Sequence, residues 1–238
     1  ELEDACHDAI RARRAAWLAL AGGRTPLPIY AKLAASEFAG TISAIPADLS
    51  TEDGCRALAR AVAADHERVH VLVNNAGATW GAPLDEHDTA SWNRVLDLNV
   101  QGVFHTTKFL LPQLRAASTT DDPARVINIG SIDGLHVPIL ETYSYSSSKA
   151  AVHQLTRHLA KHLAPEITVN AVAPGPFPSK MMRATLEAAG EAIAAGTALK
   201  RIGRDDDMAG VALFLASRAG SYLTGTIIPV DGGMSTTK

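Results

Sequence analysis

The chain has 238 residues, of which 47% are hydrophobic and 20% are charged, and its formal net charge is −3. This composition predicts one globular domain with a substantial core, and the pI near 6.3 excludes the strongly basic character of a nucleic-acid-binding protein. The sequence contains no run of about 18 apolar residues, which a membrane-spanning helix requires.

The N-terminal 21 residues favour a helix. Residues 11–23 resemble a signal peptide only weakly, because their apolar run is short and acidic residues precede it. The two cysteines, Cys6 and Cys55, have neither the spacing of a disulfide framework nor that of a zinc site. We therefore expect a cytoplasmic protein.

From residue 41 onward, strand and helix patterns alternate. The expected strands are 42–47, 69–73, 125–130, 167–172 and 226–230. The expected helices are 50–65, with Ser50 as its cap, 89–116 with an interruption at Pro112, 145–163, 179–195 and 205–217. Apolar strands separated by helices imply a parallel sheet covered on both faces. We expect an α/β fold, a doubly wound Rossmann-like sheet in a single domain over residues 1–238, incomplete or rearranged at its N-terminus.

Polar residues and glycines follow four of the expected strands. Ligands bind at the carboxyl ends of the strands in open parallel sheets, so these residues mark one candidate site. They are Asp48, Asn74, Asn75, Ala76, Gly77, Ser131, Pro174 and Gly175.

Three side chains suggest acid–base chemistry on a carbonyl group or an alcohol. Tyr145 and Lys149 stand four residues apart at the start of a helix and so share one face, while Ser131 ends the preceding strand. A cation about 5 Å from a phenol favours the phenolate by roughly 3 kcal/mol at an effective dielectric of about 20. Lys149 is therefore predicted to lower the pKa of Tyr145 toward neutrality. Tyr143 is the alternative phenol, but it lies six residues before Lys149.

The three side chains can move a proton but cannot store a hydride. A redox reaction at this site therefore needs a nicotinamide cofactor.

These motifs resemble the single-domain short-chain dehydrogenase/reductases, and in particular the 3-oxoacyl-carrier-protein reductases. The further matches are Asn99 in Leu-Asn-Val and the C-terminal Val-Asp-Gly-Gly at 230–233. The resemblance implies that Tyr145 is the acid/base, that Ser131 polarises the substrate and that Lys149 holds the nicotinamide ribose. It also implies that Asn99 supports a proton relay near Lys149.

The same resemblance implies a bound cofactor, NADP in preference to NAD. Asp48 and Leu49 would flank the adenine, and Asn75, Ala76 and Gly77 the ribose side. Pro174, Gly175, Phe177 and Ser179 would lie near the nicotinamide, within a substrate-binding loop and lid at 174–204. The implied substrate is a small ketone or secondary alcohol, and the implied class includes substrates linked to an acyl carrier. Helices 89–116 and 145–163 would form a homodimer or homotetramer.

The chain departs from the family at residues 1–40, its atypical nucleotide-binding half. The Thr-Gly-x-x-x-Gly-x-Gly loop that cradles the pyrophosphate is absent, and only Gly22, Gly23 and Gly40 occur there. Either this segment is missing or altered, for example by a change of reading frame, or cofactor binding is impaired. The second explanation admits a non-catalytic scaffold or regulatory protein as the alternative function.

A metal site is not expected. His158 and His162 are four residues apart on a helix, but the glutamate of an HExxH motif is missing. The neighbouring Arg157 and Lys161 disfavour a cation.

Overall fold

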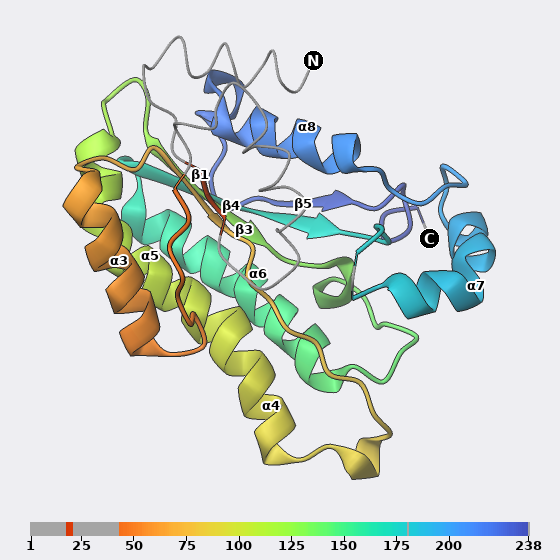
Figure 1. Cartoon of the computed structure of the whole chain (residues 1–238). Coiled ribbons are helices and arrows are strands. Elements are labelled where there is room, and N and C mark those ends of the chain that lie inside the picture. The colour runs from red at the N-terminus through yellow and green to blue at the C-terminus, as the bar shows by residue number, and fades with distance from the viewer. Residues whose placement is uncertain (1–17, 21–42, 180, 238) are drawn as a thin grey trace.

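The computed structural model describes residues 18–20, 43–179 and 181–237. Its centre is a five-stranded sheet in which every neighbouring pair of strands is parallel and the spatial order follows the chain (Figure 1). The strands are β1 (Leu18–Leu20), β2 (Val71–Asn74), β3 (Ala124–Ile129), β4 (Ile167–Pro174) and β5 (Ile227–Val230).

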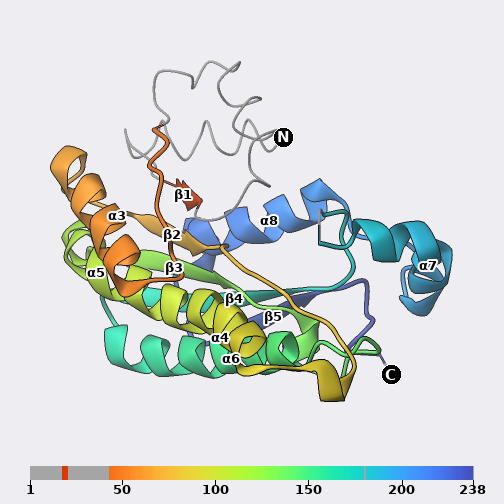
Figure 2. The ribbon, with the colours of Figure 1, turned by 60° about the horizontal axis from the view of Figure 1, so that its bottom comes forward.

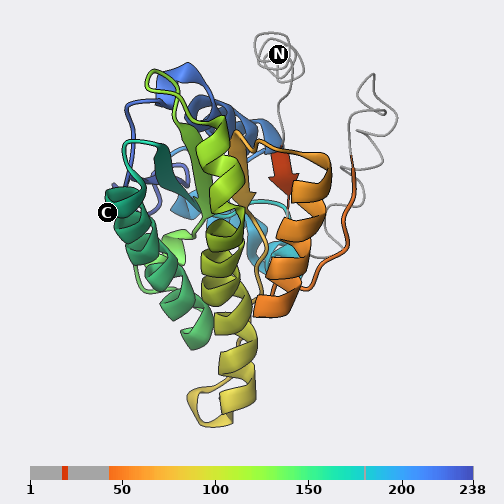
Figure 3. The ribbon, with the colours of Figure 1, turned by 90° about the vertical axis from the view of Figure 1, so that its left-hand side faces the viewer.

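Helices cover both faces of this sheet (Figure 2). Figure 3 shows α3 (Glu52–Asp65), α5 (Val103–Ala117) and α6 (Tyr143–Leu163) side by side on one face. The opposite face carries α8 (Asp205–Ala216). The expected doubly wound α/β fold is thus confirmed. The remaining helices are α4 (Thr89–Leu96) and α7 (Arg183–Gly196), with short 3-10 turns at Leu84–Glu86, Ile132–Gly134 and Arg218–Gly220 and a π-helical turn at Asp97–Gly102.

The alternation of side chains along each strand creates two cores. Leu72, Val126 and Val169 point toward α5 and α6, where they pack with Leu110 and Leu114. The residues of opposite parity form a second cluster beneath α8, which contains Val71, Val73, Ile127, Val172 and Leu215. Each fully buried aliphatic side chain contributes about 1.5–3 kcal/mol, so both layers hold the sheet rigidly.

β1 corrects the prediction of a helix over residues 1–21. Leu18–Leu20 form a strand that pairs in parallel with β2, with Leu18 opposite Val71 and Leu20 opposite Val73. Pairing satisfies backbone groups that the edge of β2 would otherwise expose, and this tertiary gain overrides a local helical preference. Residues 1–17 and 21–42, including Gly22, Gly23 and Gly40, lie outside the described residues.

The strand expected at 42–47 is wrong over its described part, because 43–48 have no regular structure. Pro46 has no N–H to donate to a ladder, which makes this segment a poor strand. The next helix, α3, is capped by Thr51, whose Oγ1 accepts a hydrogen bond of 3.1 Å from the N–H of Gly54. Ser50, the expected cap, instead donates to Asp48.

The long helix expected at 89–116 is interrupted at a different place. α5 runs through Pro112 without a break, while the change of geometry is the π-helical turn at Asp97–Gly102. Proline removes only one helical hydrogen bond, and the fully buried Leu110 and Leu114 hold the helix on the sheet around it. In the described parts of the chain, each helix is too short or too polar to cross a bilayer.

Candidate active site

Ser131 leaves the carboxyl end of β3 in a tight turn. Its Oγ accepts a hydrogen bond of 3.1 Å from the N–H of Asp133, and its carbonyl oxygen accepts another of 3.1 Å from the N–H of Gly134. Only 7% of Ser131 is exposed. Because the backbone donor occupies an acceptor position of Oγ, the hydroxyl hydrogen is left to be donated to a second group.

Tyr145 and Lys149 come from the first two turns of α6 and meet at the same place. The Lys149 Nζ lies 5.5 Å from the centre of the Tyr145 ring. The same atom donates a hydrogen bond of 2.8 Å to the carbonyl oxygen of Ile129, the last residue of β3. The strand end and the helix start are thus joined as the sequence predicts.

Burial determines the protonation of both side chains. It raises the pKa of Tyr145 to about 12, a shift that the Ser131 hydroxyl opposes by hydrogen bonding and the charge of Asp133 increases. Burial lowers the pKa of Lys149 to about 8. The predicted lowering of the Tyr145 pKa by Lys149 is therefore not observed, since desolvation dominates and the ammonium directs a hydrogen bond to Ile129. The Tyr145 hydroxyl, with a pKa of about 12, therefore keeps its proton at neutral pH.

Tyr143, the alternative phenol, is the first residue of α6 and faces another way. Its hydroxyl donates a hydrogen bond of 2.9 Å to the exposed carboxylate of Glu141. Its ring meets His87 edge-on, with 5.1 Å between the ring centres. The geometry favours Tyr145 as the acid.

Asn99 lies in the π-helical turn and ties the loop after β2 to α6. Its Oδ1 accepts a hydrogen bond of 2.7 Å from the Ala78 N–H, and its Nδ2 donates to the Ala78 carbonyl at 2.9 Å. The same Nδ2 donates to Ser148 Oγ at 2.8 Å, and that hydroxyl donates to the Tyr145 carbonyl at 2.7 Å. Asn99 therefore positions the start of α6, while its role in a proton relay stays a prediction.

Gly77 lies in the loop after β2, at the border of the site. A Cβ placed on it would lie 3.5 Å from Asn99 Oδ1 and 3.7 Å from Lys149 Nζ, so its backbone borders both groups. An ammonium has three N–H donors, and Lys149 uses one of them on Ile129.

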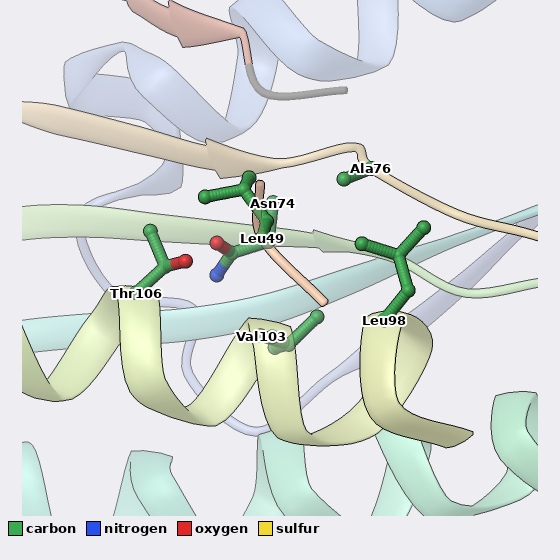
Figure 4. A pocket seen from close by; sticks show the side chains of 7 residues that line it. Leu49, Asn74, Ala76, Leu98, Val103 and Thr106 are labelled. Atoms are coloured by element: carbon green, nitrogen blue, oxygen red, sulfur yellow. The ribbon is translucent and has the colours of Figure 1, made fainter. Parts of the chain in front are cut away.

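A small, mainly apolar pocket lies beside the end of β2 (Figure 4). It is lined by Leu49, Asn74, Ala76, Leu98, Gly102, Val103 and Thr106. A Cβ at Gly102 would lie 2.5 Å from the Leu49 carbonyl oxygen, so this close approach requires glycine. The structure brings the predicted Leu49 and Ala76 together here, while Asn75 and Asp48 are exposed. Hydrogen bonds from Ser50 lower the pKa of Asp48.

The residues predicted near the nicotinamide lie on the segment that links β4 to α7. The Gly175 N–H donates to the Val230 carbonyl at 2.9 Å, and a Cβ there would lie 2.6 Å from Asp231 Cβ. Pro174 pairs with Val230 in the sheet. Phe177 packs on Gly203 and lines a second, larger pocket. Ser179 Oγ accepts a hydrogen bond of 3.1 Å from the Met182 N–H.

A buried polar network that the sequence analysis did not identify lies in the core close to the site. Asn74 Nδ2 donates to Asn128 Oδ1 at 2.8 Å and to Thr107 Oγ1 at 3.1 Å, and Asn128 Nδ2 donates to Thr156 Oγ1 at 2.9 Å. It connects β2 and β3 to α5 and α6. The signal that could have identified it is Asn128, a polar residue within the apolar strand Val-Ile-Asn-Ile.

Comparisons with known proteins show which family the chain resembles. A family model described as "Enoyl-(Acyl carrier protein) reductase" matches residues 18–235. The chain is 49% identical over 197 residues to the rhamnolipids biosynthesis 3-oxoacyl-[acyl-carrier-protein] reductase of Pseudomonas aeruginosa, covering 82% of this chain and 77% of that protein. It is 34% identical over 196 residues to a 3-oxoacyl-[acyl-carrier-protein] reductase of Thermotoga maritima, covering 82% and 78%.

Solved structures give the same result. The RhlG/NADP active-site complex of Pseudomonas aeruginosa superposes with a TM-score of 0.77 at 48% identity, covering 80% of this chain and 76% of that one. A short-chain dehydrogenase/reductase of Brucella melitensis superposes with a TM-score of 0.82 at 28% identity, covering 98% and 91%. This chain therefore belongs to the short-chain dehydrogenase/reductase family of NAD(P)-dependent oxidoreductases.

Proposed function

We propose that this enzyme uses NADPH to reduce the ketone of a 3-oxoacyl thioester, or of another small carbonyl compound, to a secondary alcohol. The observation that carries the proposal is the meeting of Ser131, Tyr145 and Lys149 beside Gly77 at the carboxyl edge of the sheet. The thioester and the choice of NADP over NAD are supported by the names of the relatives, which include a 3-oxoacyl-[acyl-carrier-protein] reductase and an NADP complex.

The cofactor supplies a hydride when it is bound. The two remaining N–H groups of Lys149 would hold its nicotinamide ribose, and Leu49 would flank its adenine. Asp48 would also flank the adenine, and Asn75, Ala76 and Gly77 would border the ribose side. Pro174, Gly175, Phe177 and Ser179 would border the nicotinamide within the loop and lid at 174–204.

Tyr145 and Ser131 would act on the same substrate atom. As the carbonyl oxygen gains negative charge, the Tyr145 hydroxyl gives it a proton and the Ser131 hydroxyl donates a hydrogen bond. A phenol with a pKa of about 12 keeps its proton at neutral pH until the alkoxide, a stronger base, develops beside it. The Lys149 ammonium then stabilises the phenolate that remains. Asn99 is proposed to support the return of a proton through Lys149.

Replacing Tyr145 by Phe tests the proposal. Loss of the proton donor is expected to lower kcat for reduction of a 3-oxoacyl thioester by about 10²–10⁴-fold, while NADPH binding followed by fluorescence is retained. Tyr143→Phe is the matched control, because that hydroxyl contacts only the exposed Glu141 among the described residues, and it should keep the wild-type rate. A Tyr145→Phe enzyme with the wild-type rate would refute the assignment.

The non-catalytic alternative is motivated by the missing glycine loop, which falls within residues 1–40. Titration of the protein with NADPH and with NADH, followed by fluorescence, separates the two functions. Tight binding of either nucleotide excludes a scaffold that has lost its cofactor. A cytoplasmic location and a homodimeric or homotetrameric assembly belong to the same proposal.

A further inference from the structure

His153 lies behind the turn that carries Ser131. It is on α6, four residues after Lys149 and eight after Tyr145, so the three side chains project from the same side of the helix. Only 2% of His153 is exposed. Its imidazole is therefore enclosed by protein directly next to the proposed catalytic residues.

Two glycines make room for this ring. A Cβ on Gly130 would lie 2.3 Å from His153 Nε2 and 2.8 Å from Cδ2, and a Cβ on Gly134 would lie 2.9 Å from Cε1. Atoms do not approach this closely without a shift, so the edge of the imidazole occupies the space between the two glycines that flank residues 131–133. The ring thus supports the turn at both of its ends.

The turn itself is held from two sides. The Gly130 N–H donates to the Val172 carbonyl in β4 at 2.7 Å, which fixes the start of the turn to the sheet. The end of the turn rests on α6, since a Cβ on Gly134 would lie 2.7 Å from Lys149 C and Ala150 N. His153 occupies the gap between these two anchoring points.

His153 carries no charge at neutral pH. Burial lowers its pKa to about 4, a shift that the Gly134 backbone opposes and that the charges of Arg157 and Lys149 increase. A neutral ring adds no repulsion beside the Lys149 ammonium. Its contribution is therefore its rigid planar shape.

We propose that His153 is a positioning residue that sets where the Ser131 hydroxyl lies relative to the Tyr145 hydroxyl. Ser131 belongs to the strand and its turn, Tyr145 belongs to the helix, and the imidazole fills the space between those elements. The inference rests on the proposed function, in which both hydroxyls contact one carbonyl oxygen. Without the ring, the turn can relax toward α6 and the two hydroxyls no longer converge.

A double-mutant cycle with Ser131 tests whether His153 acts through that residue. His153→Ala is expected to lower kcat for ketone reduction at least tenfold, while the dissociation constant for NADPH stays within twofold of wild type. In a Ser131→Ala background, the same change is expected to lower kcat by less than a further twofold. Losses that multiply in the double variant would overturn the inference, since His153 would then act independently of Ser131.

The glycines provide a second cycle with a built-in control. Gly130→Ala is expected to lower kcat in the wild type, because the new Cβ meets the imidazole, and to cost much less in the His153→Ala background. Gly134→Ala meets the α6 backbone as well, so its penalty should be similar in both backgrounds. An equal loss of kcat for Gly130→Ala in both backgrounds would argue against the proposed role of His153 in positioning the turn.

Stability and baseline activity separate the remaining outcomes. Thermal melting of each variant identifies loss of fold, and His153→Asn replaces His153→Ala in the cycle if the latter does not fold. A wild-type enzyme that reduces no ketone would overturn the proposed function and this inference together. An active wild type with multiplicative losses would overturn this inference alone.

Discussion

At the scale of the residue, Lys149 is an amine whose ionisation falls within the working range of pH. Burial lowers its pKa to about 8, whereas the Tyr145 pKa is raised to about 12. In the proposed mechanism, reduction requires both groups in their protonated forms. The high-pH limit of the reaction is therefore set by the lysine.

We expect kcat/KM for the ketone to be level below pH 8 and to fall above it, approaching tenfold per pH unit, as Lys149 loses the charge that stabilises the phenolate. Initial rates measured from pH 6 to 10 check this, with circular dichroism at each pH to confirm the fold. Lys149→Arg should move the fall of kcat/KM to higher pH, because guanidinium stays charged. The absolute rate of this variant should be lower than that of the wild type. A profile that is level to pH 10 would contradict the assignment.

At the scale of the element, the Asn74–Asn128 pair joins two strands to two helices through buried hydrogen bonds. Asn128→Ala removes two of these bonds and leaves Asn74 and Thr156 with fewer partners in a dry environment. We expect it to lower the free energy of unfolding by about 2–4 kcal/mol, measured by urea denaturation.

The control for Asn128→Ala is Asn93→Ala, an exposed position of α4, which should change stability by less than about 0.5 kcal/mol. Equal effects at the two positions would mean that the buried network contributes nothing specific.

The π-helical turn brings Gly102 against the backbone of Leu49 at the small pocket. Gly102→Ala places a Cβ 2.5 Å from the Leu49 carbonyl oxygen, so the pocket wall must move. The dissociation constant for NADPH, measured by fluorescence, is expected to rise at least tenfold, because Leu49 is proposed to flank the adenine. Gly210→Ala is the control: nothing lies within 4 Å of its Cβ in α8, and it should gain about 0.5–1 kcal/mol of stability without affecting binding.

The sequence predicted the elements whose patterns are long and regular. β2 to β5 and α6 lie within a few residues of their expected ranges, because apolar alternation and helix length are local signals. β1 was missed because three residues have no period, and only the neighbouring β2 makes them a strand. The π-helical turn was missed because residues 97–102 continue a helical pattern, and the close approach of Gly102 to Leu49 joins positions that are remote in sequence.

The candidate site also has features that the sequence predicts and features that it does not. The convergence of Ser131, Tyr145 and Lys149 was predictable from i,i+4 spacing and from the shared edge of a parallel sheet. The direction of the Tyr145 pKa shift was not, because the sequence gives the charge of Lys149 but not the depth at which both groups are buried. His153 left no signal either, since its importance arises from contacts with Gly130 and Gly134.

At the scale of the whole molecule, the structure narrows the choice of residues that could form the predicted subunit contact. Val103, Leu110 and Val152 lie on the two helices expected to form the subunit contacts, but their side chains are buried within the single chain. Phe104 on α5 is 41% exposed and is the better candidate for a subunit contact.

Light scattering coupled to gel filtration should give two or four times the chain mass of 25.0 kDa. Phe104→Glu is expected to lower that mass by placing a charge in the contact. Leu84→Glu, at a residue that is 68% exposed outside α5 and α6, should leave it unchanged. A monomeric wild type would refute the predicted assembly.

The order of the strands has a consequence for synthesis on the ribosome. From β1 to β5, each described strand lies beside the one that precedes it in the chain. Among the described strands, each one from β2 onward therefore has its neighbour already synthesised when it emerges, and none has to be inserted between two earlier ones. Between 37 and 52 residues separate neighbouring strands along the chain, and the entropic cost of closing such a segment rises only slowly with its length. The exposed growing edge is always the most recently synthesised strand, so chaperone contacts during translation should follow that edge along the chain.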